Sequence, residues 1–152
     1  MGRGGVGGLV GRVSHAVTGV PRLWTAATRA GLGPRGAVDV LRISQAALRV
    51  AAKHAVGVPG RSNAVRHFLW QAVLTARLGV DAARSLAVAQ EAGSTNRRDS
   101  TVDEHNNAVG QEYGLAHVDE LRLGSPSEAV TGLVPVALEK WEADELVWVR
   151  PH

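Results

Sequence analysis

Residues 64–78, AVRHFLWQAVLTARL, decide the fold of this chain. Each residue of an α-helix turns about 100°, which places the apolar side chains of this stretch on two roughly opposite faces. A helix that is apolar on two sides has to be covered on both. We therefore expect a central helix here, capped by Ser62 or Asn63 and ended by Gly79. One face carries Val65, Phe68, Leu69, Ala72, Val73 and Ala76, and the other carries Trp70, Leu74 and Leu78.

The flanking sequence predicts further helices and no β-hairpin. A capping box at residues 101–104, TVDE, begins a helix that Gly114 is expected to end. Another helix begins at Ser125 and is interrupted at Gly132 and Pro135. The remaining helices are expected around residues 13–30, 37–55 and 81–92, and residues 146–149 as a terminal strand or an extended tail.

The predicted fold class is all-α: a compact multi-helix domain with a central two-faced apolar helix (64–78) and an N-terminal basic helical arm. Within it we expect a flexible Gly-rich N-terminus at residues 1–12, the basic arm packed on the domain at 13–61, and a motif-bearing helical domain at 62–150.

Charge divides the chain at the end of the arm. Residues 1–61 hold nine basic side chains and one acid, a net charge of +8, whereas residues 62–152 hold eight basic and thirteen acidic ones, a net charge of −5. The arm could bind nucleic acid or, weakly, an anionic membrane surface. Its scattered arginines and single aromatic side chain, Trp24, form no stacking platform, so pairing with the acidic half of the same chain is the default expectation.

Composition excludes several classes of protein. The 152 residues include no cysteine, which excludes a disulfide scaffold, a zinc ribbon and a thiol nucleophile. No run approaches the ~18 consecutive apolar residues of a membrane span. The N-terminus lacks the compact apolar region of a secretory signal. We expect a protein that is cytoplasmic, or exported without a Sec-type signal peptide.

Two polar segments stand out from the Ala/Val/Leu background. They are residues 63–70, NAVRHFLW, and residues 103–110, DEHNNAVG, with Gln90-Glu91 and Asp99 between them. This order resembles a poorly characterised bacterial helical domain with the pattern N-A-x-R-H-x-x-W, then H-E, then D-x-H-N-N-x-x-G. Domains of that family occur alone and in secreted or toxin-like proteins. Residues 60–114 carry the resemblance, which departs from the pattern where Gln90 replaces a histidine.

The residues of these segments suggest acid–base chemistry. His67 lies in the first turns of its helix, where the dipole favours the neutral imidazole that a general base or a metal ligand needs. A core histidine bonded to a carbonyl group is the structural alternative. The candidate catalytic residues are His67, Glu91, Asp103 and His105, and a divalent metal, if there is one, would be bound by His67, Glu91 and Asp103. The substrate or network candidates are Arg66, Trp70, Asn106, Asn107 and Asp99.

Helical spacing predicts how some of these side chains meet. Arg66, Trp70 and Arg77 share one stripe, and an arginine stacked on a surface tryptophan is the simplest interpretation. If Arg66 is buried, it should meet a carboxylate from Glu91, Asp99 or Asp103. On the second motif Asn106 falls in the buried seam, and Gly110 would allow close approach of another helix. We expect His67, Glu91, Asp103 and Asn106 to form one polar network between helices.

Three hypotheses follow. The first is a toxin- or effector-type hydrolase, a setting that the resemblance implies, with an immunity or effector protein as partner. The second is a non-catalytic interaction domain in which the polar residues form a structural buried network. The third is binding of an anionic membrane surface or nucleic acid through the basic N-terminal half.

Overall fold

The computed structural model describes residues 20–92 and 97–148, with the backbone alone at residues 97–99. In this part of the chain the regular structure is entirely helical, as the sequence predicted. The predicted flexible segment 1–12 and the first part of the arm, up to residue 19, lie outside it. The helices are residues 20–29, α2 (Gly33–His54), α3 (Arg61–Leu78), α4 (Val80–Glu91), α5 (Arg97–Ala116), α6 (Val118–Leu121), α7 (Pro126–Gly132) and α8 (Val134–Glu142).

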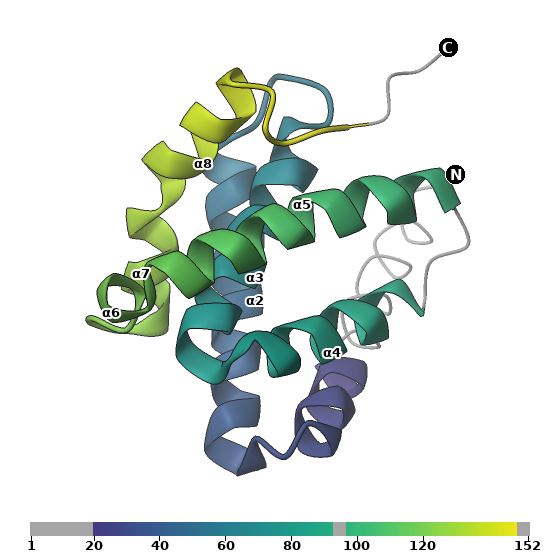
Figure 1. Ribbon diagram of the computed structural model, residues 1–152, viewed down its shortest axis with the longest axis vertical. Helices are drawn as coiled ribbons and strands as arrows, with labels where there is room; N and C mark the ends of the chain where they lie inside the picture. The colour runs from purple at the N-terminus through teal and green to yellow at the C-terminus, as the bar shows by residue number, and fades with distance from the viewer. Residues whose placement is uncertain (1–19, 93–96, 149–152) are drawn as a thin grey trace, which may run out of the picture.

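Helix α3 is the centre of the fold, as its two apolar faces predicted. It packs against α2, α4, α5, α6, α7 and α8, and α5 crosses it on the side shown in Figure 1. From Ala64 to Ala76 every residue except Arg66 is buried. The helix begins earlier than expected, after Gly60 at φ +77°, and has no side-chain cap. The cap predicted at Ser62 or Asn63 is therefore wrong, because the left-handed turn at Gly60 already starts the helix.

Helix α5 lies close against α3 through two glycines. A Cβ atom at Gly110 would lie 2.7 Å from the carbonyl oxygen of Phe68, and one at Gly114 would lie 2.5 Å from that of Ala72. The expected close approach at Gly110 is confirmed. The helix end predicted at Gly114 is wrong: the helix continues to Ala116, because this glycine serves packing between helices and not chain termination. The start predicted at residues 101–104 is also wrong, since α5 already begins at Arg97.

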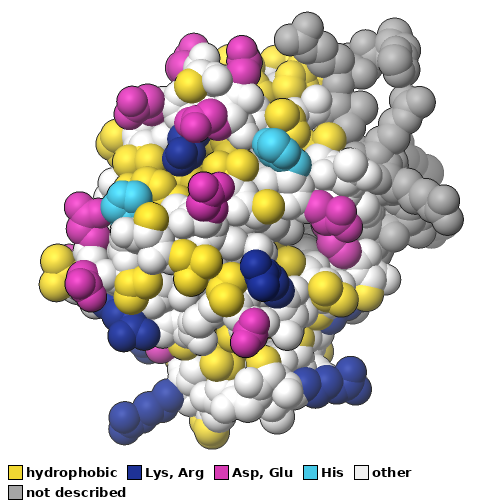
Figure 2. Space-filling model, viewed as in Figure 1, with side chains coloured by type: hydrophobic (Ala, Val, Ile, Leu, Met, Phe, Trp, Pro, Cys, Tyr) yellow, Lys and Arg dark blue, Asp and Glu magenta, His cyan; other side chains and the backbone are white. Residues whose placement is uncertain are grey.

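Helix α2 contributes one apolar face to the core and carries charge on the other. Its Val40, Ile43 and Ala47 are buried, while Arg42 and Arg49 are exposed. It packs on α3 and α7. On the face drawn in Figure 2 the acidic side chains lie mainly over the upper part of the molecule and several basic ones project at its lower end. No helix in the described ranges 20–92 and 97–148 is both long and apolar enough to cross a membrane.

The C-terminal part has the helix start predicted at Ser125 and the break predicted at Gly132, but Pro135 lies in the first turn of α8 and interrupts no helix. Ser125 and Glu128 form the capping box of α7, and the chain breaks between α7 and α8 next to Gly132. After α8 the described chain is irregular up to Trp148. Of the two alternatives predicted for this region, a strand or an extended tail, the structure shows the tail. Side chains of α5 bind it, as described below.

Candidate functional site

A polar cluster lies where the second turn of α3 faces α5. His67, 2% exposed, has both ring nitrogens in polar contact. Nδ1 lies 2.8 Å from Oδ1 of Asn107. Nε2 lies 3.3 Å from Nη2 of Arg66 and 3.4 Å from Oδ1 of Asp103. Because an amide oxygen can only accept, Nδ1 carries the proton and the lone pair of Nε2 faces Arg66 and Asp103.

The surroundings keep this imidazole neutral. Burial and, to a smaller extent, the positive charge of Arg66 lower the pKa of His67 to about 4, although the hydrogen bond that the ring donates to Asn107 and the charge of Glu91 act in the opposite direction. At neutral pH the ring is therefore uncharged, as a general base must be before it accepts a proton.

Arg66 is held inside the cluster rather than at the surface. Its Nη2 donates to Oδ1 of Asn63 at 3.0 Å and to Nε2 of His67. Burial lowers the pKa of Arg66, and the nearby charge of Asp103 partly offsets that effect. Arg66 is only partly buried, and neither of the two described salt bridges includes it, so the expected contact with a carboxylate is limited to the effect of the Asp103 charge on its pKa.

The predicted stack of Arg66 on a surface Trp70 is wrong. Trp70 is 6% exposed, because both faces of α3 are covered, and its indole Nε1 donates to Oγ of Ser44 at 2.9 Å. The indole instead meets the His67 ring edge-on, with the ring centroids 6.0 Å apart. Arg77, on the same helical stripe, donates to the carbonyl oxygens of Leu121 and Gly124.

Asn63 belongs to the cluster although sequence reasoning assigned it only a cap. Its Nδ2 donates to Oδ1 of Asp103 at 2.8 Å, while its Oδ1 accepts from Arg66. The amide therefore joins α3 to α5 and fixes the carboxylate beside His67. The signal was available in the motif, where Asn63 stands one helical turn before His67.

The two other candidate carboxylates are those of Glu91 and Asp99. Oε2 of Glu91, at the end of α4, is buried and lacks a hydrogen-bond partner within the described residues, and its charge acts on His67. The side chain of Asp99 lies outside the described part. Within that part no group of three His, Asp or Glu side chains is arranged to hold a metal ion, so His67, Glu91 and Asp103 are not gathered as a ligand set.

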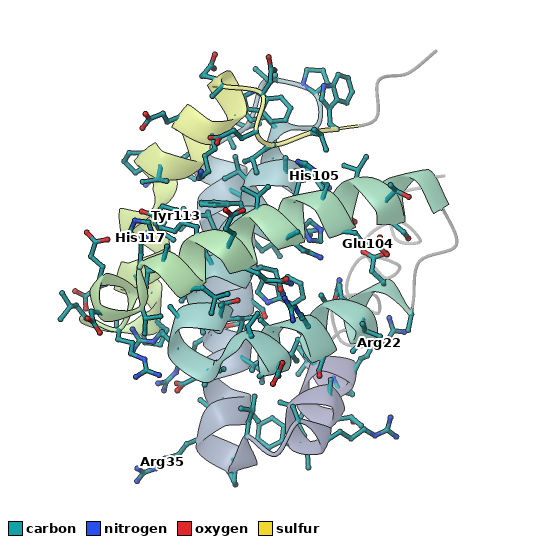
Figure 3. The ribbon with its side chains drawn as sticks, viewed as in Figure 1. Arg22, Arg35, Glu104, His105, Tyr113 and His117 are labelled. Atoms are coloured by element: carbon teal, nitrogen blue, oxygen red, sulfur yellow. The ribbon has the colours of Figure 1, made fainter. Side chains whose placement is uncertain are left out.

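Asn106 does not join the His67 cluster, contrary to the network expected from the sequence, and the candidate catalytic residue His105 also lies outside that cluster. Asn106 donates from Nδ2 to the carbonyl oxygen of Val147 and accepts the N–H of the same residue at Oδ1, both at 2.9 Å. Nε2 of His105 lies 2.9 Å from the carbonyl oxygen of Glu145. Figure 3 labels His105 on the side of α5 toward the C-terminal tail. These residues bind the tail because a turn of about 100° separates Asn106 from Asn107.

A second polar link between helices was missed. Gln71, fully buried in α3, donates from Nε2 to the carbonyl oxygen of Ala83 at 3.1 Å and accepts from Nε2 of Gln111 at 2.7 Å. It therefore connects α3 with α4 and α5. A glutamine between the two apolar faces of the central helix was the available signal.

Comparison with known proteins identifies one family. The model of a domain of unknown function (DUF6973) matches residues 31–136, a range that contains both polar motifs and Glu91. No curated protein and no solved structure matches the chain. The resemblance to a poorly characterised domain is thereby supported, and the chain belongs to the DUF6973 family.

Proposed function

We propose that this domain is a hydrolase whose acid–base pair is His67 and Asp103. One observation carries the proposal: Nε2 of the neutral His67 imidazole lies 3.4 Å from Oδ1 of Asp103. Two acceptor atoms this close repel each other unless a proton is shared between them. During attack by a water molecule Nε2 accepts the proton that the water loses, and the carboxylate of Asp103 stabilises the imidazolium ion that forms in that step.

The neighbouring residues fit supporting roles. Asn107 fixes the ring through Nδ1, as an orienting group does for a catalytic histidine. Arg66 supplies positive charge beside Nε2 and can stabilise the negative charge that develops on the substrate oxygen during attack by water. Glu91, whose buried Oε2 has no hydrogen-bond partner among the described residues, is the second acid–base group of the proposal.

Arg66 also links substrate binding to base strength. Its charge is the second-largest cause of the lowered His67 pKa. When Arg66 pairs with a substrate oxygen that becomes negative, that influence on the imidazole weakens. The pKa of His67 then rises, and the base is stronger in the complex than in the free domain.

The toxin or effector setting remains part of this proposal and is supported by the resemblance alone. It predicts that induction of the domain slows the growth of a bacterial host, and that a dedicated immunity-type protein relieves the effect.

Hydrolysis is tested with a panel of chromogenic esters, phosphoesters and peptides. We expect one class to be cleaved, and the change His67→Gln to reduce the rate by about 100-fold or more, the usual contribution of a general base. His54→Gln is the matched control, because His54 is an exposed histidine at the end of α2. A folded His67→Gln protein that retains the full rate or the full growth defect would refute the catalytic role.

One observation favours the non-catalytic alternative: His67 is 2% exposed. A sealed, fully bonded histidine can serve only to fix α3 against α5. In that case His67→Gln lowers the free energy of unfolding while every separately assayed activity stays unchanged. Measuring stability and rate on the same variant separates the two functions.

A further inference from the structure

A hollow lies beside the end of α8, and none of the residues of the His67 cluster lines it. Its volume is about 380 Å³. We call it the C-terminal hollow; its lining residues are Trp141, Glu142, Asp144, Leu146, Val147 and Trp148. Two of the four tryptophans of the chain therefore face one small space, together with two carboxylates.

The walls of the hollow are fixed from the body of the domain. Leu146 is 3% exposed and anchors the tail in the core. Asn106 binds both backbone groups of Val147. The Trp148 side chain packs directly on Gly60, where any Cβ atom would overlap its ring. The hollow is therefore formed before any ligand arrives, which lowers the entropy cost of binding.

Two exposed carboxylates lie at the rim of the hollow. Glu142 and Asp144 are exposed, and neither is part of a salt bridge with another described residue. The nearby Lys140 is already paired, since its Nζ lies 3.4 Å from Oε2 of Glu145. Among the described residues, no lysine or arginine lines the hollow or forms a salt bridge with either of these carboxylates.

Asp144 occupies a position where glycine would be less strained. Its φ is +58°, the only left-handed backbone among non-glycine residues of the described chain. The N–H of Asp144 donates to the carbonyl oxygen of Trp141, and that of Glu145 to Lys140, an arrangement that ends helices and usually employs glycine. An aspartate here reduces stability but provides a carboxylate at the hollow, as functional positions often do.

We propose that the C-terminal hollow binds a small organic cation, an alkylated ammonium group such as that of choline. Indole faces attract cations through the ring quadrupole, and aromatic walls with carboxylates at the rim are the usual recognition site for alkylated ammonium ions. The alkyl groups contact the rings while the charge is balanced by Glu142 and Asp144. The site is independent of the hydrolase proposal.

The test follows the four indole N–H signals of the ¹⁵N-labelled full chain by NMR during titration with tetramethylammonium and choline. We expect millimolar ligand to shift the signals of Trp141 and Trp148 and to leave Trp24 and Trp70 unchanged. The matched control ligand is 3,3-dimethylbutan-1-ol, the uncharged isostere of choline. Equal shifts with this alcohol, or no shift with either cation, would overturn the proposal.

The cation affinity of two variants distinguishes a binding role of the carboxylates from a purely structural one. Glu142→Gln should weaken cation binding about fivefold, as loss of one partly exposed carboxylate implies. Asp144→Gly should raise the melting temperature and weaken binding together. Glu139→Gln, an exposed acid of α8 outside the hollow, should change neither. Unchanged affinity in both hollow variants refutes the site.

The source of the cation is distinguished by a parallel sedimentation assay with phosphatidylcholine vesicles. Co-sedimentation that free choline competes away supports the site with a lipid headgroup as its ligand. NMR shifts with free choline and no co-sedimentation support the site with a free cation.

Discussion

Replacing Gly114 by alanine should lower the stability of the domain, although alanine is the better helix former. At this glycine α5 and α3 approach each other backbone to backbone. A Cβ atom there would lie 2.5 Å from the carbonyl oxygen of Ala72 and 2.8 Å from Cβ of Thr75. Ordinary contacts of a Cβ atom begin at 3.4 Å. Neither neighbour is the flexible end of a side chain, so α5 itself has to move by about 1 Å.

The magnitude follows from two opposing effects. Overpacking at a rigid site costs typically about 1–3 kcal/mol, and the collision with a backbone carbonyl group places Gly114→Ala near the upper end. The gain in helix propensity offsets about 1 kcal/mol. We expect a net loss of about 2 kcal/mol in the free energy of unfolding. For a domain of this size that corresponds to a fall of roughly 4–8 °C in Tm.

The assay is thermal and urea unfolding followed by circular dichroism at the helical band, with Gly132→Ala as the control. Gly132 ends α7, and a Cβ atom there meets nothing within 4 Å. That variant should be as stable as the parent or more stable by up to about 1 kcal/mol. A Gly114→Ala protein that melts at or above the parent temperature would show that the two helices are not in backbone contact and refute the reasoning.

Three further predictions concern polar groups. The pKa of His67 is lowered to about 4 from 6.5, so the stability that its neutral form contributes is present above pH 6.5 and is lost as the pH falls toward 4. The loss is about 3 kcal/mol; urea unfolding of His67→Gln should show a flatter pH profile, and parallel profiles would contradict it. Asn106→Leu should destabilise the domain by about 2 kcal/mol and make the tail beyond Glu145 sensitive to limited proteolysis; an equally resistant tail would show that Asn106 does not hold it. Ser125→Ala should cost about 1 kcal/mol by removing the capping box with Glu128, and an unchanged urea midpoint would argue against the cap.

Much of the fold could be predicted because its signals are local. The two apolar faces of residues 64–78 indicated a central helix, and the Ser125 capping box and the break beside Gly132 lie where the sequence predicted them. Gly114 was misread as a helix end because a glycine that ends a helix and one that admits a neighbouring helix look alike in sequence. The difference depends on what lies opposite.

The candidate site was predicted in part. The two motifs contained Arg66, His67, Asp103 and Asn107, which the structure brings together. We expected Asn106 in the same cluster because it lies on the buried side of its helix, but its side chain binds the C-terminal tail. A rotation of α5 by one residue would bring a different side chain to each of these partners, and no local pattern determines that rotation.

The sequence by itself determined that this protein is all-helical, that residues 64–78 lie at its centre, and which polar side chains have to find partners inside it. Periodicity, caps and charge are properties of neighbouring residues, so they can be read along the chain. Only the tertiary structure decided that His67 meets Asn107 and Asp103, that Asn106 and His105 hold the tail, and that two tryptophans share a hollow with two acids. Those pairings depend on how α5 is rotated and how closely it approaches α3, which the packing of all the helices sets together.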